Sequence, residues 1–507
     1  MLVVELNKAN FEYDVNSIVR AFYPEEQVYV LTPECREEKR EQLGGNVRIR
    51  VELGEEGALL SVDGREYGWE WRGDSQESPE PVGDAAGDEE TAGKTDEKTY
   101  KYGFKCFLYR ALCQETGKEL PWGNLTGIRP TKIAYQLLEQ GACEQEIIDH
   151  YMLRYYVSRN KAKLSVDIAR RERELLGGLC VQDDYSLYIG IPFCPSTCLY
   201  CSFTSFPIAA YREKVDGYID CLIKEMEFVA QRYRDRRLDC VYIGGGTPTT
   251  LEAEQLERLL TKLKALFDFS TVREFTVEAG RADSITEDKL RVLHSFGVDR
   301  ISVNPQTMKQ ETLDIIGRKA SVAQVEEAYA LARKLGFDNI NMDLILGLPG
   351  ELEEDVQRTI DRVVELAPDS LTVHSLAIKR ASRLNRWIQE NGMPILHNTD
   401  ETMEIAAKGA ERLGLVPYYL YRQKNMSGNF ENVGYAREGK LGLYNILIME
   451  EKQTIVACGA GSVSKRVYPD GRIERCENVK DVSQYIERIG EMIERKRVLL
   501  EDKQFKI

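Results

Sequence analysis

Three cysteines lie within eight residues of one another in the stretch YIGIPFCPSTCLYCSF (188–203): Cys194, Cys198 and Cys201. Thiolates bind soft metal centres such as zinc and iron-sulfur clusters. Zinc usually needs four protein ligands, and the chain has only 4 histidines, so a zinc site is disfavoured. Two interpretations remain open. The thiols are structural, or they hold a four-iron four-sulfur cluster that leaves one iron without a protein ligand.

An open iron would give this cluster a chemical use. It can bind the amine and carboxylate of a small molecule, and S-adenosylmethionine (SAM) carries both groups beside a sulfonium. A reduced cluster can pass an electron into the sulfonium C–S bond, which releases a 5'-deoxyadenosyl radical. The spacing of the cysteines therefore favours radical chemistry over purely structural thiols.

Further polar or glycine-rich motifs follow the predicted strands of the same region. GGGTPT (244–249) permits a close backbone approach to a ligand, or simply forms a tight turn. An amino acid needs an acid for its ammonium and a guanidinium for its carboxylate, and ribose hydroxyls need acceptors. The residues that could supply these groups are Glu278, Gln306, Arg318 and Asp343. Each alone is equally well explained by an ion pair or a cap, but their joint occurrence at strand ends favours a binding site.

Six short apolar runs after Asp183 alternate with amphipathic stretches. The runs are Ser186–Ile191, Cys240–Ile243, Glu274–Glu278, Arg300–Val303, Asn341–Leu346 and Ser370–His374. Helices are expected after them, for example over Tyr218–Arg232, Glu254–Phe267 and Val322–Leu335. Repeated strand-then-helix units predict parallel strands with right-handed crossovers, and hence an α/β fold with a partial six-stranded barrel of the TIM type. The motifs above then meet at the C-terminal strand ends, where such folds place their chemistry.

The rest of the chain suggests four flanking segments. We expect a small α+β N-terminal domain, made of a β-containing module (1–72), an acidic linker (73–98) and a helical segment (99–180). The barrel would occupy 181–395. A C-terminal closing domain (396–507) would contain the β-like stretches YNILIM (444–449) and TIVAC (454–458).

The overall charge narrows the function classes. A net charge of -15 and a pI near 5.1 argue against nonspecific nucleic-acid binding, which needs a basic face.

No stretch approaches the roughly 18 apolar residues of a membrane span, and a secretory signal pattern is not evident at the N-terminus. We therefore expect a cytoplasmic protein, with an oligomeric state that the sequence leaves open.

The sequence CPSTCLYC resembles the C-x-x-x-C-x-x-C signature of radical SAM enzymes, and the region 185–390 is similar to that superfamily. Within it, the motifs most resemble the oxygen-independent coproporphyrinogen III oxidase family (coproporphyrinogen dehydrogenases), and especially its HemZ branch. The resemblance implies a 4Fe-4S cluster on the three cysteines and one or two molecules of SAM. The residues implied to bind SAM are Tyr188, Gly245, Gly246, Thr247, Glu278, Gln306, Arg318, Asp343 and Ala377.

The resemblance also implies a substrate, which is a tetrapyrrole with several propionates, and an electron donor of the flavodoxin or ferredoxin type. Basic residues could bind the propionates, namely Lys379, Arg380, Arg383, Arg422 and Lys424. One departure matters: the triad is followed by Ser202 and Phe203, where characterised oxidases have another cysteine. Relatives regarded as haem chaperones share that phenylalanine. A haem-transfer protein and another radical reaction, such as methyl transfer, therefore stay as alternatives to decarboxylation.

Overall fold

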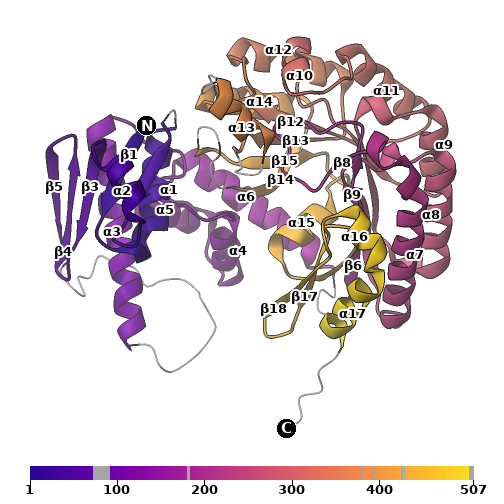
Figure 1. Ribbon diagram of the computed structural model, residues 1–507, viewed down its shortest axis with the longest axis horizontal. Coiled ribbons are helices and arrows are strands. Elements are labelled where there is room, and N and C mark those ends of the chain that lie inside the picture. The colour runs from indigo at the N-terminus through magenta and orange to yellow at the C-terminus, as the bar shows by residue number, and fades with distance from the viewer. Residues whose placement is uncertain are drawn as a thin grey trace, which may run out of the picture. The chain divides into compact units, whose positions relative to one another are not determined.

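The structure is a computed structural model that describes residues 1–24, 26–71, 92–179, 183–378, 382–391, 396–423, 426 and 429–501. The chain forms two compact units (Figure 1). The first, here called the N-terminal unit, comprises Met1–Arg170 and Leu420–Glu431. The second, here called the barrel unit, comprises Arg171–Tyr419 and Asn432–Ile507.

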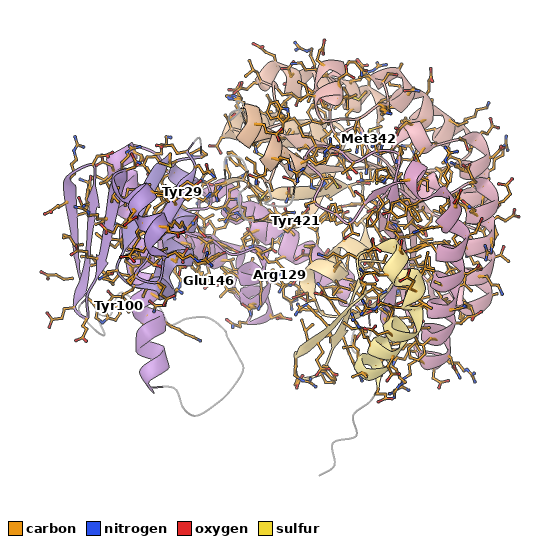
Figure 2. All side chains as sticks on the ribbon, in the orientation of Figure 1. Tyr29, Tyr100, Arg129, Glu146, Met342 and Tyr421 are labelled. Carbon is orange, nitrogen blue, oxygen red and sulfur yellow. The ribbon has the colours of Figure 1, made fainter. Side chains whose placement is uncertain are left out.

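In its described part, the N-terminal unit contains a five-stranded sheet in the order β2-β1-β3-β4-β5. The strands are β1 (Leu2–Leu6), β2 (Val28–Leu31), β3 (Val47–Leu53), β4 (Gly57–Val62) and β5 (Arg65–Glu70). A hairpin between β4 and β5 turns at Asp63 and Gly64, and both residues have positive φ angles, 46° and 87°. Apolar side chains of the sheet pack with those of α1 (Glu12–Phe22) and α3 (Ala92–Thr116) in one core. Tyr100 of α3, labelled in Figure 2, donates its hydroxyl to the carbonyls of Gly54 and Gly57.

The helical segment expected at 99–180 is present as four helices. They are α3, α4 (Thr131–Glu139), α5 (Glu144–Tyr155) and α6 (Arg159–Leu176). Helix α3 begins inside the predicted linker, whose residues 73–91 lie outside the described residues. A buried network joins this helical part to the segment Leu420–Glu431. Trp122 Nε1 donates to one carboxylate oxygen of Glu431 (2.7 Å), and Lys161 Nζ donates to the other (2.5 Å).

The six predicted barrel strands are all confirmed. They are β6 (Tyr185–Ile191), β9 (Leu238–Gly245), β10 (Glu274–Gly280), β11 (Arg300–Val303), β12 (Ile340–Leu346) and β13 (Ser370–Ser375). Each pairs in parallel with the next in chain order. The crossover helices include α7 (Val215–Arg232), α8 (Ala253–Leu266), α9 (Glu287–Ser295) and α11 (Val322–Lys334), and they line the outer side of the curved sheet (Figure 1). Met342 of β12, labelled in Figure 2, is fully buried.

The sheet is a partial barrel, and strands from the C-terminal part of the chain extend both of its edges. β16 (Thr454–Cys458) pairs in parallel with β6, and β15 (Asn432–Ala436) pairs antiparallel with β13. Among the described residues the sheet therefore has 11 strands, from β14 (Val416–Tyr421) to β18 (Ile473–Glu477). Residues 432–507 group with the barrel strands in one compact unit, and the closing domain expected at 396–507 stays a prediction.

One predicted strand is wrong. TIVAC is β16, but YNILIM lies in helix α15 (Leu443–Glu450). The helix buries Leu443, Ile446 and Leu447, so its apolar residues recur at helical spacing. A short apolar run fits a buried strand and a buried helix equally well, and here packing decided the outcome. None of the described helices combines the length and the apolar character that a membrane crossing requires.

Candidate active site

The three clustered cysteines follow β6, at the C-terminal edge of the parallel sheet. Cys194 ends the two-residue strand β7 (Phe193–Cys194), and its sulfur lies 3.4 Å from Thr247 Oγ1. Cys194 and Cys198 are buried, and Cys201 is half-buried. Burial raises the pKa of the Cys194 thiol to about 11 and also raises the pKa of Cys201. Such thiols keep their protons at neutral pH unless a coordinating metal removes them.

The arrangement of these thiols suits a cluster better than a single ion. Within the described ranges, no three His, Cys, Asp or Glu side chains gather closely enough to hold one metal ion. In a four-iron cluster each thiolate binds a different iron, so the three sulfurs need not converge on one point. The donor set, three thiols on one short loop, therefore fits a 4Fe-4S cluster with one iron left open.

Hydrogen bonds from three sides hold residues 193–201, which carry the three cysteines and are here called the cysteine loop. Leu199 donates its backbone N–H to the carbonyl of Ile316 (2.9 Å), and Arg383 donates Nη1 to the carbonyl of Thr197 (3.0 Å). Arg281 donates Nη1 to the carbonyl and to the hydroxyl of Ser196, both at 2.9 Å. Arg281 is not among the predicted site residues, although it lies only three residues after Glu278. Its position beside the loop arises from the pairing of β6, β9 and β10, which no local pattern displays.

The glycines of GGGTPT pack against the cysteine loop itself. A Cβ on Gly246 would lie 2.5 Å from the carbonyl oxygen of Phe193, and Gly245 has a φ of +109°. The N–H of Gly246 donates to Ile191, and the N–H of Thr247 donates to Phe193. The close backbone approach expected here is therefore present, and its partner in this structure is the chain's own backbone.

Glu278, at the end of β10, is held by a tyrosine that the sequence analysis did not single out. Tyr242 donates its hydroxyl to Glu278 Oε1 (2.5 Å), and the N–H of Gly245 lies 3.3 Å from Oε2. Burial raises the pKa of Glu278 to about 7. The Tyr242 ring stacks on Tyr188, which was expected in the site, and on Tyr444 of α15, with centroids 6.2 and 4.4 Å apart.

Residues 304–318, which follow β11, include buried polar atoms that lack partners among the described residues. These atoms are Gln306 Oε1, Arg318 Nε and Asn304 Oδ1. The remaining Arg318 nitrogens bond the carbonyl of Asn304 and the hydroxyl of Tyr200. The backbone of Gln306, with a φ of +67°, bonds Asp343 on β12. Buried donors and acceptors are rarely left unpaired, so this group fits a polar ligand such as SAM. Ala377, also expected here, is half-buried just after β13.

Comparisons with known proteins agree with this geometry. Residues 188–363 match the radical SAM superfamily. The oxygen-independent coproporphyrinogen-III oxidase-like protein HemZ of Bacillus subtilis (strain 168) is 41% identical over 401 residues, which span 78% of this chain and 80% of the relative. The chain belongs to this family of radical SAM proteins. The family assignment implies a 4Fe-4S cluster and SAM as cofactors, and the residues described above fit both.

Other members of the radical SAM superfamily carry different names. The heme chaperone HemW of Bacillus subtilis (strain 168) is 31% identical over 309 residues, or 60% of this chain and 76% of HemW. A solved structure of the coproporphyrinogen III oxidase HemN from Escherichia coli is 23% identical, with a TM-score of 0.49. It covers 63% of this chain and 72% of HemN. The names of the two Bacillus subtilis relatives therefore include an oxidase-like protein and a chaperone.

Of the five basic residues expected to bind substrate in this radical SAM protein, the structure describes two, Arg383 and Arg422. Lys379, Arg380 and Lys424 lie outside the described residues. Arg383 is exposed and bonds the cysteine loop. Arg422 belongs to the N-terminal unit, where it is 5% exposed.

Contacts within its own unit hold the Arg422 side chain. Its guanidinium donates to the carbonyl of Leu125 (2.5 Å) and to the side chain of Asn429 (2.6 Å), and it lies over the ring of Trp122. Burial lowers the pKa of Arg422 to about 10. These contacts hold the segment Leu420–Glu431 in its unit, and the binding of a substrate propionate by Arg422 stays a prediction.

Proposed function

We propose that this protein is a radical SAM enzyme that decarboxylates two propionates of coproporphyrinogen III to vinyl groups, without oxygen, to give protoporphyrinogen IX. The observation that carries the proposal is the cysteine loop beside the unpaired polar atoms of Gln306 and Arg318. The choice of substrate rests on the name of the HemZ relative. The electron donor would be a flavodoxin or ferredoxin.

Each residue of the site has a proposed task. Cys194, Cys198 and Cys201 would hold the cluster, which supplies an electron for cleaving bound SAM to a 5'-deoxyadenosyl radical. The Glu278 carboxylate would hold the SAM ammonium, and Arg318 would hold the SAM carboxylate. Gln306 and Asp343 would accept hydrogen bonds from ribose hydroxyls.

The proposed reaction balances for each propionate. The radical takes one hydrogen atom from the β-carbon, the bond between the α-carbon and the carboxylate breaks to release carbon dioxide, and one further electron passes to an acceptor. The buried positions of Cys194 and Cys198 support this chemistry because water is kept from the site where the radical would form.

The test is an anaerobic product assay on reconstituted protein with coproporphyrinogen III, SAM and dithionite. We expect vinyl products by mass spectrometry together with 5'-deoxyadenosine, and neither product from Cys198→Ala. Formation of 5'-deoxyadenosine with no change in the tetrapyrrole would contradict the decarboxylase. S-adenosylhomocysteine among the products would indicate methyl transfer instead.

A second candidate function is haem transfer, and one observation favours it. Phe203, two residues after Cys201, is 71% exposed, although a large apolar side chain gains by burial. An exposed ring beside the site could pack against the face of a porphyrin. If the chain is a chaperone, titration with haem should give a stable absorption band without turnover, and Phe203→Ser should weaken the binding.

A further inference from the structure

A guanidinium lies against one of the cluster cysteines. Arg281 is 4% exposed, and its Nη1 is 3.7 Å from the sulfur of Cys198. The same nitrogen bonds the carbonyl and the hydroxyl of Ser196, which belongs to the cysteine loop. Arg281 therefore contacts the loop at its backbone and at a sulfur.

The charge of Arg281 is partly balanced on its other side. Nε donates to Asp283 Oδ1 (2.9 Å) and Nη2 donates to Oδ2 (2.6 Å), which is a bidentate pair. Both side chains are largely buried, at 4% and 16% exposure. This fork orients the guanidinium so that Nη1 points at the loop, which a lysine could not reproduce.

Arg318 is a second cation that interacts with Cys198. Its nitrogens bond Asn304 and Tyr200, and its proposed task is to hold the SAM carboxylate. Arg281 has no such task, because its nitrogens are used by Asp283, Ser196 and the Cys198 sulfur. The two arginines can therefore be tested separately.

We propose that Arg281 is a positioning residue that raises the reduction potential of the iron-sulfur cluster, and that Asp283 limits the increase. The inference rests on the proposed function, because it assumes that the cluster binds. Reduction adds negative charge to a cluster. Hydrogen bonds to its sulfurs and nearby positive charge stabilise the reduced form. Such interactions are strong in a buried site, where water screens them little.

The experiment is a redox titration, followed by electron paramagnetic resonance, of anaerobically reconstituted full-length protein without SAM. Arg281→Gln removes the cation, so its midpoint potential should become more negative. Asp283→Asn leaves the guanidinium without its counter-charge, so its potential should become less negative. Opposite shifts distinguish a charge effect from a loosened loop, which would not depend on the sign of the removed charge.

Two further variants complete the test. Ser196→Ala removes one loop contact but keeps Arg281 beside Cys198, so its potential should equal that of the wild type. Arg291→Gln removes an exposed arginine that pairs with Glu287, and it should also leave the potential unchanged. If Arg281→Gln fails to assemble a cluster, Arg281→Lys replaces it. Lysine keeps the positive charge but not the bidentate pair with Asp283, so the midpoint potential of this variant should be more negative than that of the wild type.

The outcomes separate the two proposals. A wild-type protein that binds no cluster would overturn the proposed function and this inference together. A wild type that binds a cluster and cleaves SAM, with the same potential in the Arg281 variants and in Asp283→Asn, would overturn the inference alone. A shift of both in the same direction would also overturn it.

Discussion

Cys194, Cys198 and Cys201 differ from the other cysteines of the chain in lying on one short loop. Replacing any one of them with Ala is expected to abolish the visible charge-transfer absorption of reconstituted protein, because an iron loses its protein ligand. Cys106→Ala and Cys458→Ala are matched controls and should keep the absorption, since both residues lie outside the loop. Absorption that survives in all three loop variants would contradict the cluster assignment.

The raised pKa of Glu278 predicts how SAM binding depends on pH. Its pKa is raised to about 7, so the carboxylate is protonated below that pH and ionised above it. Since only the ionised form attracts an ammonium, SAM affinity should increase as the pH rises through about 7. The affinity should increase ~10-fold between pH 6 and pH 9. Equilibrium binding of SAM to reconstituted protein over that range would check the increase.

Tyr242 is expected to set the midpoint of that pH dependence. Its hydrogen bond stabilises the Glu278 carboxylate and so lowers the pKa of Glu278. In Tyr242→Phe the midpoint should therefore move to higher pH. Tyr444→Phe keeps the stacked ring and the bond between Tyr242 and Glu278, so its midpoint should stay near that of the wild type. Equal midpoints in all three proteins would exclude this role for Tyr242.

The turn after β9 depends on glycine because it lies against the cysteine loop. In Gly246→Ala the new methyl would overlap the carbonyl of Phe193, and overpacking of this kind costs about 1–3 kcal/mol. We expect a lower free energy of unfolding and weaker SAM binding. Gly217→Ala is the control, because nothing lies within 4 Å of its added Cβ. Gly217 lies in helix α7, so the free energy of unfolding of that variant should increase by about 0.5–1 kcal/mol. Chemical denaturation would measure both changes.

A buried ion pair joins the C-terminal part of the chain to the barrel. Lys496 of α17 (Ile489–Leu500) lies 2.6 Å from Glu225 of α7, and both side chains are fully buried. Glu225 also accepts hydrogen bonds from Asn478, Tyr485 and the N–H of Gly459. The pair therefore anchors residues that follow β16 to a helix of the barrel.

Lys496→Met should lower the free energy of unfolding by about 3–5 kcal/mol, because it leaves the Glu225 charge buried and unpaired. The double variant Glu225→Gln with Lys496→Met should recover part of that loss. Arg497→Gln removes exposed ion pairs with Glu494 and Glu501, and it should change the free energy of unfolding by less than about 1 kcal/mol. A small effect of Lys496→Met in urea denaturation would contradict this anchoring role.

Much of the barrel could be predicted because its signals are local. Strand-length apolar runs, amphipathic helices and glycine turns each arise within a few residues, so the six strands and the crossover helices were placed correctly. The radical SAM prediction came from the resemblance of CPSTCLYC to the signature of that superfamily. The types and spacing of residues that are close together in the sequence were enough for these predictions.

Only the tertiary structure decided which distant groups meet. It placed Arg281 against Cys198 and Tyr242 against Glu278, it buried Arg422 over the ring of Trp122, and it made YNILIM a helix. It also joined the C-terminal strands to the edges of the barrel sheet. These outcomes depend on packing between segments far apart in the chain, where burial and hydrogen bonding outweigh local preference.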